Sequence, residues 1–218
     1  MIDYAAARHQ MVDCQVRTNR VTDVALIETL REIPRERFVP QRLRSIAYID
    51  EDLEIAPGRY LMEPMVFARL LQAARVTPTD VALDLAGGTG YGAAVLSRLA
   101  STVVAVEADG ALSAEAAAAL AEVGADNVVT VTADPSAGYA DQAPFDVIVC
   151  EAALASMPEA VLAQLAEGGR AVAVLRKPDA VGHATLWERH RGHVSHRTLF
   201  EAQVPLLPGA AREPSFVF

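Results

Sequence analysis

The clearest pattern along the chain is a short apolar run that enters a cluster of glycines and continues as a helix. The run covers residues 81–85, the glycines are Gly87, Gly88 and Gly90, and apolar residues follow at 93–96. A strand, a glycine turn and a helix start in this order are typical of the first crossover of a nucleotide-binding α/β sheet. The bare glycine backbone and the free N–H groups of the helix start would then face a ligand.

Strands and helices alternate through the rest of the second half. The pattern predicts strands at 102–106, 127–131, 145–150 and 170–175, a helix at 111–123, a helix capped by Ser156 and running from Pro158 to Gly168, and an antiparallel hairpin of 184–189 with 194–201. This alternation is the pattern of a largely parallel sheet. The strand at 145–150 directs its end, Glu151, towards the ligand side of that sheet.

Helical spacing dominates the first part of the chain. Apolar residues at intervals of three and four predict helices at residues 1–20, after the capping pair Thr22-Asp23 up to Pro34, and from Pro64 to Arg75. Residues 51–64 are expected to form a loop with a turn at Pro57-Gly58. We therefore expect a single domain, residues 1–218, with a helical addition and substrate-side loop at 1–78 and a cofactor-binding core at 79–218.

Composition limits the partners. The chain has 218 residues, a net charge of -9 and an isoelectric point of about 5.0, so attraction to nucleic acid or to an anionic membrane is not expected. The four arginines of the region after Pro34 are interpreted as a solvated face; they are Arg35, Arg37, Arg42 and Arg44. Two cysteines without metal spacing, and no apolar leader, favour a cytoplasmic protein. His190, His193 and His196 are interpreted as a polar hairpin tip, so no metal is expected.

Charge indicates which ligand the glycine turn would bind. Residues 88–93 satisfy the dinucleotide pattern G-x-G-x-x-G/A, which is a weak signal alone. A dinucleotide places a pyrophosphate at this turn, where the carboxylate of Asp84 would repel it. S-adenosylmethionine has no phosphate and has a sulfonium and an ammonium group, so carboxylates around the turn suit it.

Two further acids follow the next two strands. Glu107 is placed for the hydroxyls of a ribose, and Asp134 can accept a bond from an adenine amino group. Each acid alone could equally be a solvated loop carboxylate. Three acids at successive strand ends favour a methyl-donor site.

With these residues in place, the chain resembles the protein-L-isoaspartate O-methyltransferase family over nearly its whole length. The matching pieces are M-V-D-C-Q-V-R (11–17), I-P-R-E-R-F-V-P (33–40), A-Y-I-D (47–50), the glycine turn, A-D-P-S-A-G-Y (133–139), P-F-D (144–146) and L-x-x-G-G-R (165–170). The resemblance implies a Rossmann-like S-adenosylmethionine-dependent methyltransferase sheet of seven strands, the last antiparallel, and methylation of isoaspartyl carboxylates in damaged proteins. The cofactor-binding residues are then Asp84, Ala86, Gly87, Gly88, Gly90, Tyr91, Glu107 and Asp134.

One loop departs from the family pattern G-x-T-I-S-Q-P. Residues 58–64 are G-R-Y-L-M-E-P, so Tyr60 replaces the threonine, Met62 the serine and Glu63 the glutamine. A methionine cannot donate a hydrogen bond, and a lost bond to a charged group is worth about 1.5–3 kcal/mol. If Glu63 faced the acceptor, it would also repel a carboxylate. Ala86 in place of the first family glycine, and Leu207 in place of a C-terminal threonine, are further departures.

Three functions remain open from the sequence. The first is a methyltransferase with an altered acceptor and weak or no isoaspartyl activity, in which Tyr60 and Met62 line the acceptor side. Its partner would be a protein or peptide carboxylate or an unknown small acceptor. The second is a genuine isoaspartyl repair enzyme, and the third a non-catalytic binding or regulatory protein on the same fold. Met62 either fills a cavity or shapes a more apolar acceptor pocket.

Overall fold

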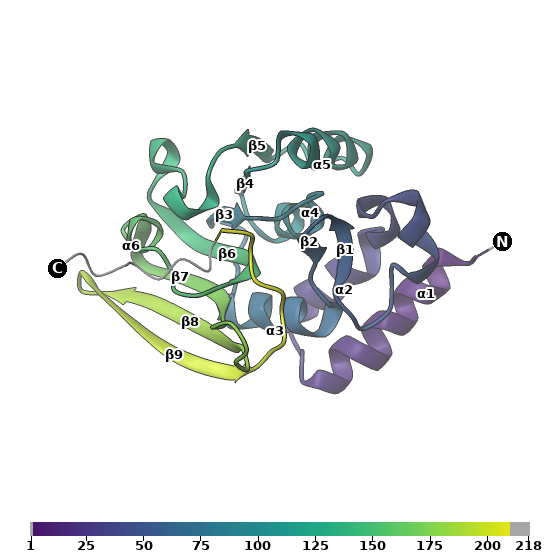
Figure 1. Cartoon of the computed structure of the whole chain (residues 1–218), viewed down its shortest axis with the longest axis horizontal. Helices are drawn as coiled ribbons and strands as arrows, with labels where there is room; N and C mark the ends of the chain where they lie inside the picture. Colours follow the sequence, from purple (N-terminus) through teal and green to yellow (C-terminus); the bar gives the residue numbers. More distant parts are fainter. Residues whose placement is uncertain (1, 210–218) are drawn as a thin grey trace.

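A twisted sheet of seven strands forms the centre of the molecule in the computed structural model, which describes residues 2–209 (Figure 1). The strands are β3 (Val81–Leu85), β4 (Thr102–Glu107), β5 (Val128–Thr132), β6 (Phe145–Leu154), β7 (Leu165–Leu175), β8 (His183–His190) and β9 (His193–Glu201). Their order is β5-β4-β3-β6-β7-β8-β9, parallel from β5 to β7. β8 is antiparallel to β7, and β9 is antiparallel to β8. The predicted fold class is confirmed, although residues 210–218 of the predicted core lie outside the described residues.

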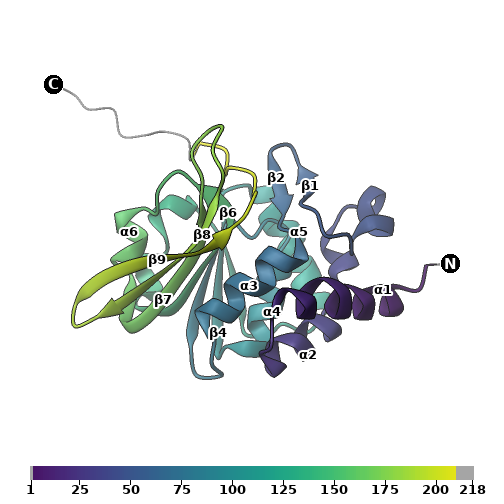
Figure 2. The same ribbon diagram turned by 90° about the horizontal axis from the view of Figure 1, so that it is seen from below.

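The two faces of the sheet belong to two separate hydrophobic clusters, because successive side chains of a strand point in opposite directions. Ala82 belongs to the larger cluster and its neighbour Leu83 to the smaller one, and both side chains are fully buried. Figure 2 shows the helices α1 to α5 on one side of the sheet and α6 on the other. Central strands buried on both faces consist of near-continuous apolar residues, which is why the sequence predicts β3 so accurately.

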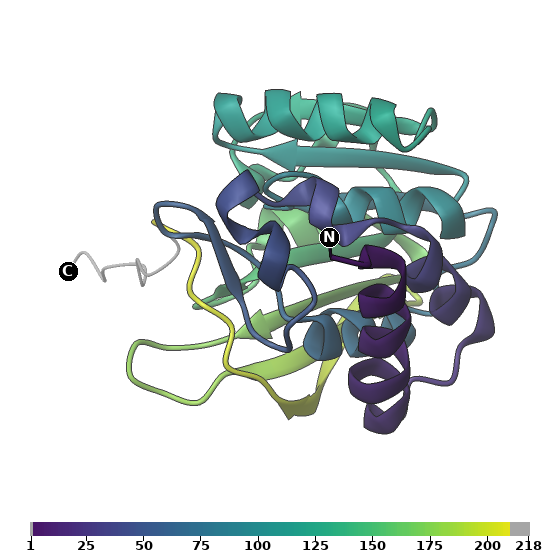
Figure 3. The same cartoon turned by 90° about the vertical axis from the view of Figure 1, so that its right-hand side faces the viewer.

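The helices match most of the predictions. They are α1 (Tyr4–Met11, extended by one π turn, Val12–Val16, and one 3₁₀ turn, Arg17–Asn19), α2 (Val24–Glu32), α3 (Pro64–Ala74), α4 (Tyr91–Leu99), α5 (Gly110–Glu122) and α6 (Glu159–Leu162). Asp23 caps α2 as expected, since its carboxylate accepts from the Leu26 N–H at 2.9 Å. α2 packs against α4, so the N-terminal helices join the larger cluster (Figure 3).

The predicted loop at 51–64 is wrong, because it contains a β-hairpin of β1 (Leu53–Ala56) and β2 (Arg59–Leu61) around the predicted Pro57-Gly58 turn. Gly58 adopts a φ of +69°, which glycine tolerates without strain. The strands have four and three residues. One of their inward positions is Arg59, a charged residue. Because it interrupts an already short apolar alternation, the sequence pattern does not reveal the two strands. The hairpin lies at the carboxyl end of the parallel strands (Figure 2).

Two other predictions are corrected. The helix expected from Pro158 to Gly168 ends at Leu162, and Ser156 is not its cap; β7 already begins at Leu165, opposite Phe145. The first arginine of the supposed solvated face, Arg35, is completely buried. It donates at 2.8 Å to the carbonyl oxygens of Ala47 and Met62, so it joins two loops of the N-terminal region. Among residues 2–209, no helix has the length and apolar content needed to cross a bilayer.

Candidate cofactor and acceptor site

The glycine turn between β3 and α4 has the backbone that its sequence predicts. Gly88 and Gly90 adopt φ values of +58° and +89°, and Gly90 is the residue at the start of α4. No side chain caps that helix start, so its first N–H groups are available to a ligand. Ala86 also has a left-handed φ of +58°, a conformation that costs an L-residue with a side chain about 1–2 kcal/mol. The methyl group at this family glycine position is therefore accommodated with strain.

Asp84 and Glu151 form a buried pair of acids beneath this turn. Both are almost inaccessible, at 0% and 3% exposed. Among the described residues, no donor makes a well-formed hydrogen bond to either oxygen of Asp84 or to Oε1 of Glu151, although the Ala93 N–H at the start of α4 approaches Asp84 and opposes the rise in its pKa. Burial raises the pKa of Asp84 to about 7 and raises that of Glu151 well above its usual range. A carboxyl pair without other well-formed hydrogen bonds is satisfied when one proton bridges it, so Glu151 is the protonated partner that donates to Asp84.

The glycines of the turn make room for these acids. A Cβ built on Gly87 would lie 2.5 Å from Oδ2 of Asp84. A Cβ on Gly92 would overlap the carboxyl group of Glu151. Neither position therefore tolerates a side chain without displacing an acid.

Glu107 lies at the end of β4, where the sequence places it, but its carboxylate is already bound. Arg59 of the β1–β2 hairpin donates through Nη1 to Oε1 and through Nη2 to Oε2, the latter at 2.6 Å. The backbone N–H groups of Gly88 and Asp109 donate to Oε2 and Oε1, each at 3.0 Å. The Arg59 and Glu107 side chains are only 10% and 5% exposed. Arg59 occupies the unspecified position x of the family pattern G-x-T-I-S-Q-P, and no sequence pattern marks it as a site residue.

The same hairpin also packs against the turn. The Cδ1 atom of Ile55 lies 2.5 Å from the place of a Cβ on Gly88. The cavity lined by Asp84, Gly88 and Glu107 measures about 10 Å³, about the space that one water molecule requires, whereas ligand pockets measure about 300–1,000 Å³. In this conformation the pocket does not hold an adenosyl group.

Asp134 lies apart from these residues. It is exposed, and its carboxylate accepts at 2.8 Å from the Ser136 N–H within its own turn. It lines a different cavity, of about 470 Å³, together with Leu154, Ser156 and Leu207. The structure therefore does not bring Asp134 and Glu107 to one cavity.

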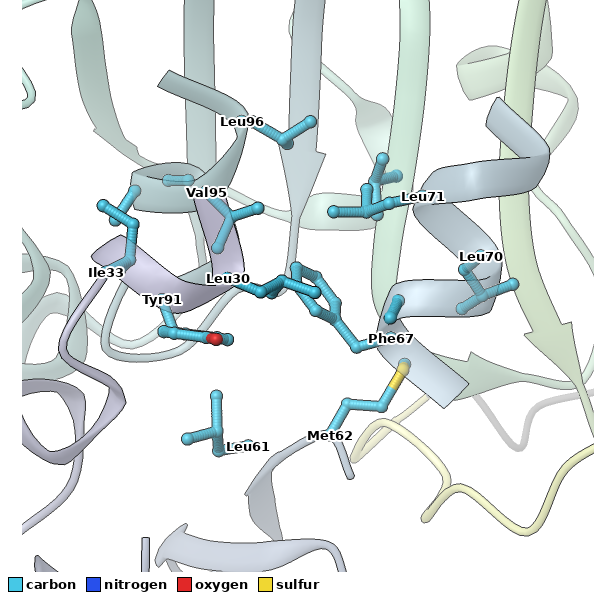
Figure 4. Close-up of a cluster of buried hydrophobic side chains, with 14 of the residues drawn as sticks. Leu30, Ile33, Leu61, Met62, Phe67, Leu70, Leu71, Tyr91, Val95 and Leu96 are labelled. Carbon is cyan, nitrogen blue, oxygen red and sulfur yellow. The ribbon is translucent and has the colours of Figure 1, made fainter. Parts of the chain in front are cut away.

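Tyr91 and Met62 are both core residues (Figure 4). Each is 1% exposed. The Tyr91 ring lies 5.7 Å from that of Phe38 and 5.6 Å from that of Phe67, and the Arg35 guanidinium lies 4.9 Å from the Tyr91 centroid. The Met62 side chain extends towards Phe67 and Leu70 (Figure 4). Of the two alternatives for Met62, cavity filling and an apolar acceptor pocket, this position agrees with cavity filling. Tyr60 is half-buried on the opposite side of β2.

Glu63 belongs to an acidic group next to Met62. Its backbone N–H donates at 2.8 Å to Asp52. Burial raises the pKa of Glu63 to about 7, with further contributions from the negative charges of Asp52, Asp50 and Glu51. Burial likewise raises the pKa of Asp52 to about 6. The loop thus has a carboxyl group in place of the family's amide and a methionine in place of its serine, while Tyr60 retains a hydroxyl.

The open glycine backbone and the buried carboxyl group of Asp84 are compatible with the methionine end expected for S-adenosylmethionine. At the position expected for the ribose, the Glu107 carboxylate is already bound to Arg59. No group of three or more His, Cys, Asp or Glu side chains within residues 2–209 is arranged to hold a metal.

Comparisons with a family model and with individual proteins all identify the same methyltransferase family. A family model described as Protein-L-isoaspartate(D-aspartate) O-methyltransferase (PCMT) matches residues 7–207. The chain is 41% identical over 176 residues to the protein-L-isoaspartate O-methyltransferase of Koribacter versatilis, covering 81% of this chain and 79% of that protein. It is 37% identical over 208 residues to that of Methylorubrum extorquens, covering 95% and 91%.

Solved structures agree with the sequence comparison. The chain superposes on a protein-L-isoaspartate O-methyltransferase with a TM-score of 0.82 and 26% identity, covering 94% of this chain and 67% of that chain. A putative protein-L-isoaspartate O-methyltransferase from Plasmodium falciparum, in complex with S-adenosyl-L-homocysteine, has the same fold, with a TM-score of 0.79 and 17% identity over 92% and 97% of the two chains.

Proposed function

The chain belongs to the protein-L-isoaspartate O-methyltransferase family of S-adenosylmethionine-dependent enzymes, and from this premise we propose that it transfers a methyl group to an acceptor other than the isoaspartyl carboxylate. The observation that supports the altered acceptor is the loop at 60–63. Met62 is buried in the core, and Glu63 lies among Asp50, Glu51 and Asp52.

The cofactor end of the proposal depends on Asp84 and the glycine turn. S-adenosylmethionine supplies an electrophilic methyl group on a sulfonium. Asp84, which lines the small cavity beneath the turn, would hold the cationic methionine end, and the backbone at Gly88 and Gly90 would allow close approach. Glu107 would hold the ribose once Arg59 has left it. Transfer then requires alignment of acceptor atom, methyl group and sulfur, S-adenosylhomocysteine is the leaving group, and an acceptor atom that carries a proton must also lose it.

The acceptor end of the proposal depends on charge. An isoaspartyl group is an anion at neutral pH. A loop that lacks the family's serine hydroxyl and has an additional carboxyl group withdraws a hydrogen bond and adds repulsion, although Tyr60 retains a phenolic hydroxyl. We therefore expect the acceptor to be neutral or cationic where it meets residues 60–63.

Isoaspartyl repair is the second candidate, because the relatives that are 41% and 37% identical are named for that activity. A labelled-methyl assay separates the two. We expect transfer to an isoaspartyl peptide to be about 10–100-fold slower than by a family member with the T-I-S-Q-P loop, which is the factor that one lost bond to a charged group produces. Transfer at the family rate would reject the altered acceptor.

A matched variant tests the loop itself. Met62→Ser together with Glu63→Gln restores the family's hydroxyl and amide, and it should increase transfer to the isoaspartyl peptide at least tenfold over the parent chain. The matching peptide with a normal aspartate serves as the negative acceptor. Thermal unfolding of the variant shows whether the core tolerates the loss of the buried methionine.

A further inference from the structure

The β1–β2 hairpin contacts the cofactor region through two inward side chains. Arg59 reaches Glu107 at the end of β4, and its Nη2 also donates at 3.0 Å to the carbonyl oxygen of Ala86 in the glycine turn. Ile55, on the other strand of the hairpin, presses against Gly88. One short hairpin therefore closes both the strand end and the turn.

The carboxylate of Glu107 has no acceptor capacity left. A carboxylate has two oxygens with two lone pairs each, which gives four acceptor positions. Arg59 uses one on each oxygen, and the N–H groups of Gly88 and Asp109 use the others. The two backbone donors belong to the scaffold of the site. The two positions that a ribose diol needs are those held by Arg59.

The guanidinium of Arg59 matches the geometry of the Glu107 carboxylate that it binds. Its guanidinium presents two parallel N–H groups to the two oxygens, which is the strongest geometry of a charged pair. It also donates to the Ala86 carbonyl oxygen in the glycine turn. The cavity on the other side of Glu107, towards Ser113 and Ala116, measures about 10 Å³ and has room for about one water molecule.

We propose that Arg59 is an internal competitor of the adenosyl ligand: it occupies the ribose-binding positions of Glu107, and ligand binding requires the β1–β2 hairpin to move outward. The inference rests on the proposed function, since it concerns the same cofactor. Because a ligand binds only the open fraction of the protein, the closed hairpin lowers the apparent affinity in proportion. The same movement displaces residues 60–63, so cofactor binding and the shape of the acceptor loop are coupled.

Calorimetry with S-adenosylhomocysteine tests the competition. The Arg59→Gln variant removes the charge and one of the two donors, and its dissociation constant should be at least tenfold lower than that of the parent chain. The matched control is Arg37→Gln, whose guanidinium forms an exposed pair with Glu122; its dissociation constant should equal that of the parent. Equal dissociation constants for Arg59→Gln and the parent would overturn the competition while leaving the proposed function intact. Absence of binding by both would overturn the proposed function as well.

A second variant covers the case in which Arg59→Gln does not fold. Ile55→Ala leaves the ion pair intact and removes the atoms that lie over Gly88, and it should also bind S-adenosylhomocysteine more tightly than the parent. Unchanged binding by a folded Ile55→Ala variant would contradict the closed hairpin.

Hydrogen exchange provides a measurement on the parent chain. Saturation with S-adenosylhomocysteine should accelerate amide exchange in residues 53–61 while it slows exchange in residues 84–92. A ligand that enters beneath a hairpin that stays closed would slow exchange in both segments, and that result would reject the proposal.

Discussion

Asp84 and Glu107 are acids at the ends of adjacent parallel strands, and the structure leaves them in opposite states. Asp84 has two oxygens without a well-formed hydrogen bond from a donor among the described residues, whereas Glu107 accepts four hydrogen bonds. Both are deeply buried. Burial raises the pKa of Asp84, which shares a proton with Glu151. Glu107 instead forms an ion pair with the buried Arg59. Two carboxyl groups near the ends of adjacent strands thus differ in their partners: Asp84 faces another acid, whereas Glu107 is paired with an arginine.

The largest expected effect follows from removing the saturated acid. Glu107→Gln leaves the Arg59 guanidinium buried without its counter-charge, which should lower the free energy of unfolding by about 3–5 kcal/mol. Denaturant unfolding measures it. The control is Glu122→Gln, which breaks the exposed pair with Arg37 and should cost less than about 1 kcal/mol. Similar losses for both variants would show that burial does not distinguish the two pairs.

Removing the orphaned acid should change the pH dependence of stability. The unfolded chain releases the Asp84 proton near its ordinary pKa of 3.8, and the native protein keeps it up to about pH 7. Between these values the native state binds more protons, so the free energy of unfolding falls as pH rises, and the loss is complete above about pH 7. Asp84→Asn removes this contribution, on the order of 4 kcal/mol for a pKa raised from 3.8 to about 7.

Urea unfolding at several pH values tests this expectation. The curve of the Asp84→Asn variant should rise above that of the parent from pH 4 to pH 8. Asp134→Asn, at an exposed acid, should follow the parent. Asp52 and Glu63 also have raised pKa values, so some decline remains in every variant. Parallel curves for the parent and Asp84→Asn would contradict the buried, shared proton.

The smallest expected effect lies at the turn between the two acids. Ala86→Gly relieves the left-handed strain of about 1–2 kcal/mol but increases the entropy of the unfolded chain, so the net gain in stability should be about 0.5–1 kcal/mol. Ala94→Gly in the interior of α4 has no such strain to relieve, and it should lower stability by about 1 kcal/mol. A loss in the Ala86→Gly variant would show that the methyl group contributes packing that outweighs the strain.

The difference between the two acids also marks how far the sequence could predict the site. Asp84 and the glycine turn lie within ten consecutive residues, so local spacing defines them. The Arg59–Glu107 pair joins residues 48 positions apart, and no periodicity relates them. The hairpin that brings them together has strands of four and three residues, too short for a pattern, and its inward arginine resembles a surface residue. The acids were predicted from their strand ends, whereas their partners depend on tertiary packing.

The acceptor loop, residues 60–63, is a second region where the sequence identifies the residues but not their tertiary contacts. The absence of the family serine at Met62 is evident from the sequence. Whether Met62 lines a pocket or fills the core depends on the direction of one side chain, and Phe67 and Leu70 determine that direction. The sequence likewise contains Asp50, Asp52 and Glu63 as separate acids. The effect of the first two on the pKa of Glu63 depends on distances that only the folded chain establishes.

The fit between Gly92 and Glu151 has a consequence for how this chain can diverge. Because any side chain at 92 overlaps the carboxyl group at 151, the two positions vary as one unit, and the order of substitution matters. A longer residue at 92 requires either that the Glu151 carboxyl group moves or that 151 is shortened first, so shortening 151 first is the less costly order. A combinatorial library at both positions should therefore recover small–large and large–small combinations and lack the large–large quadrant.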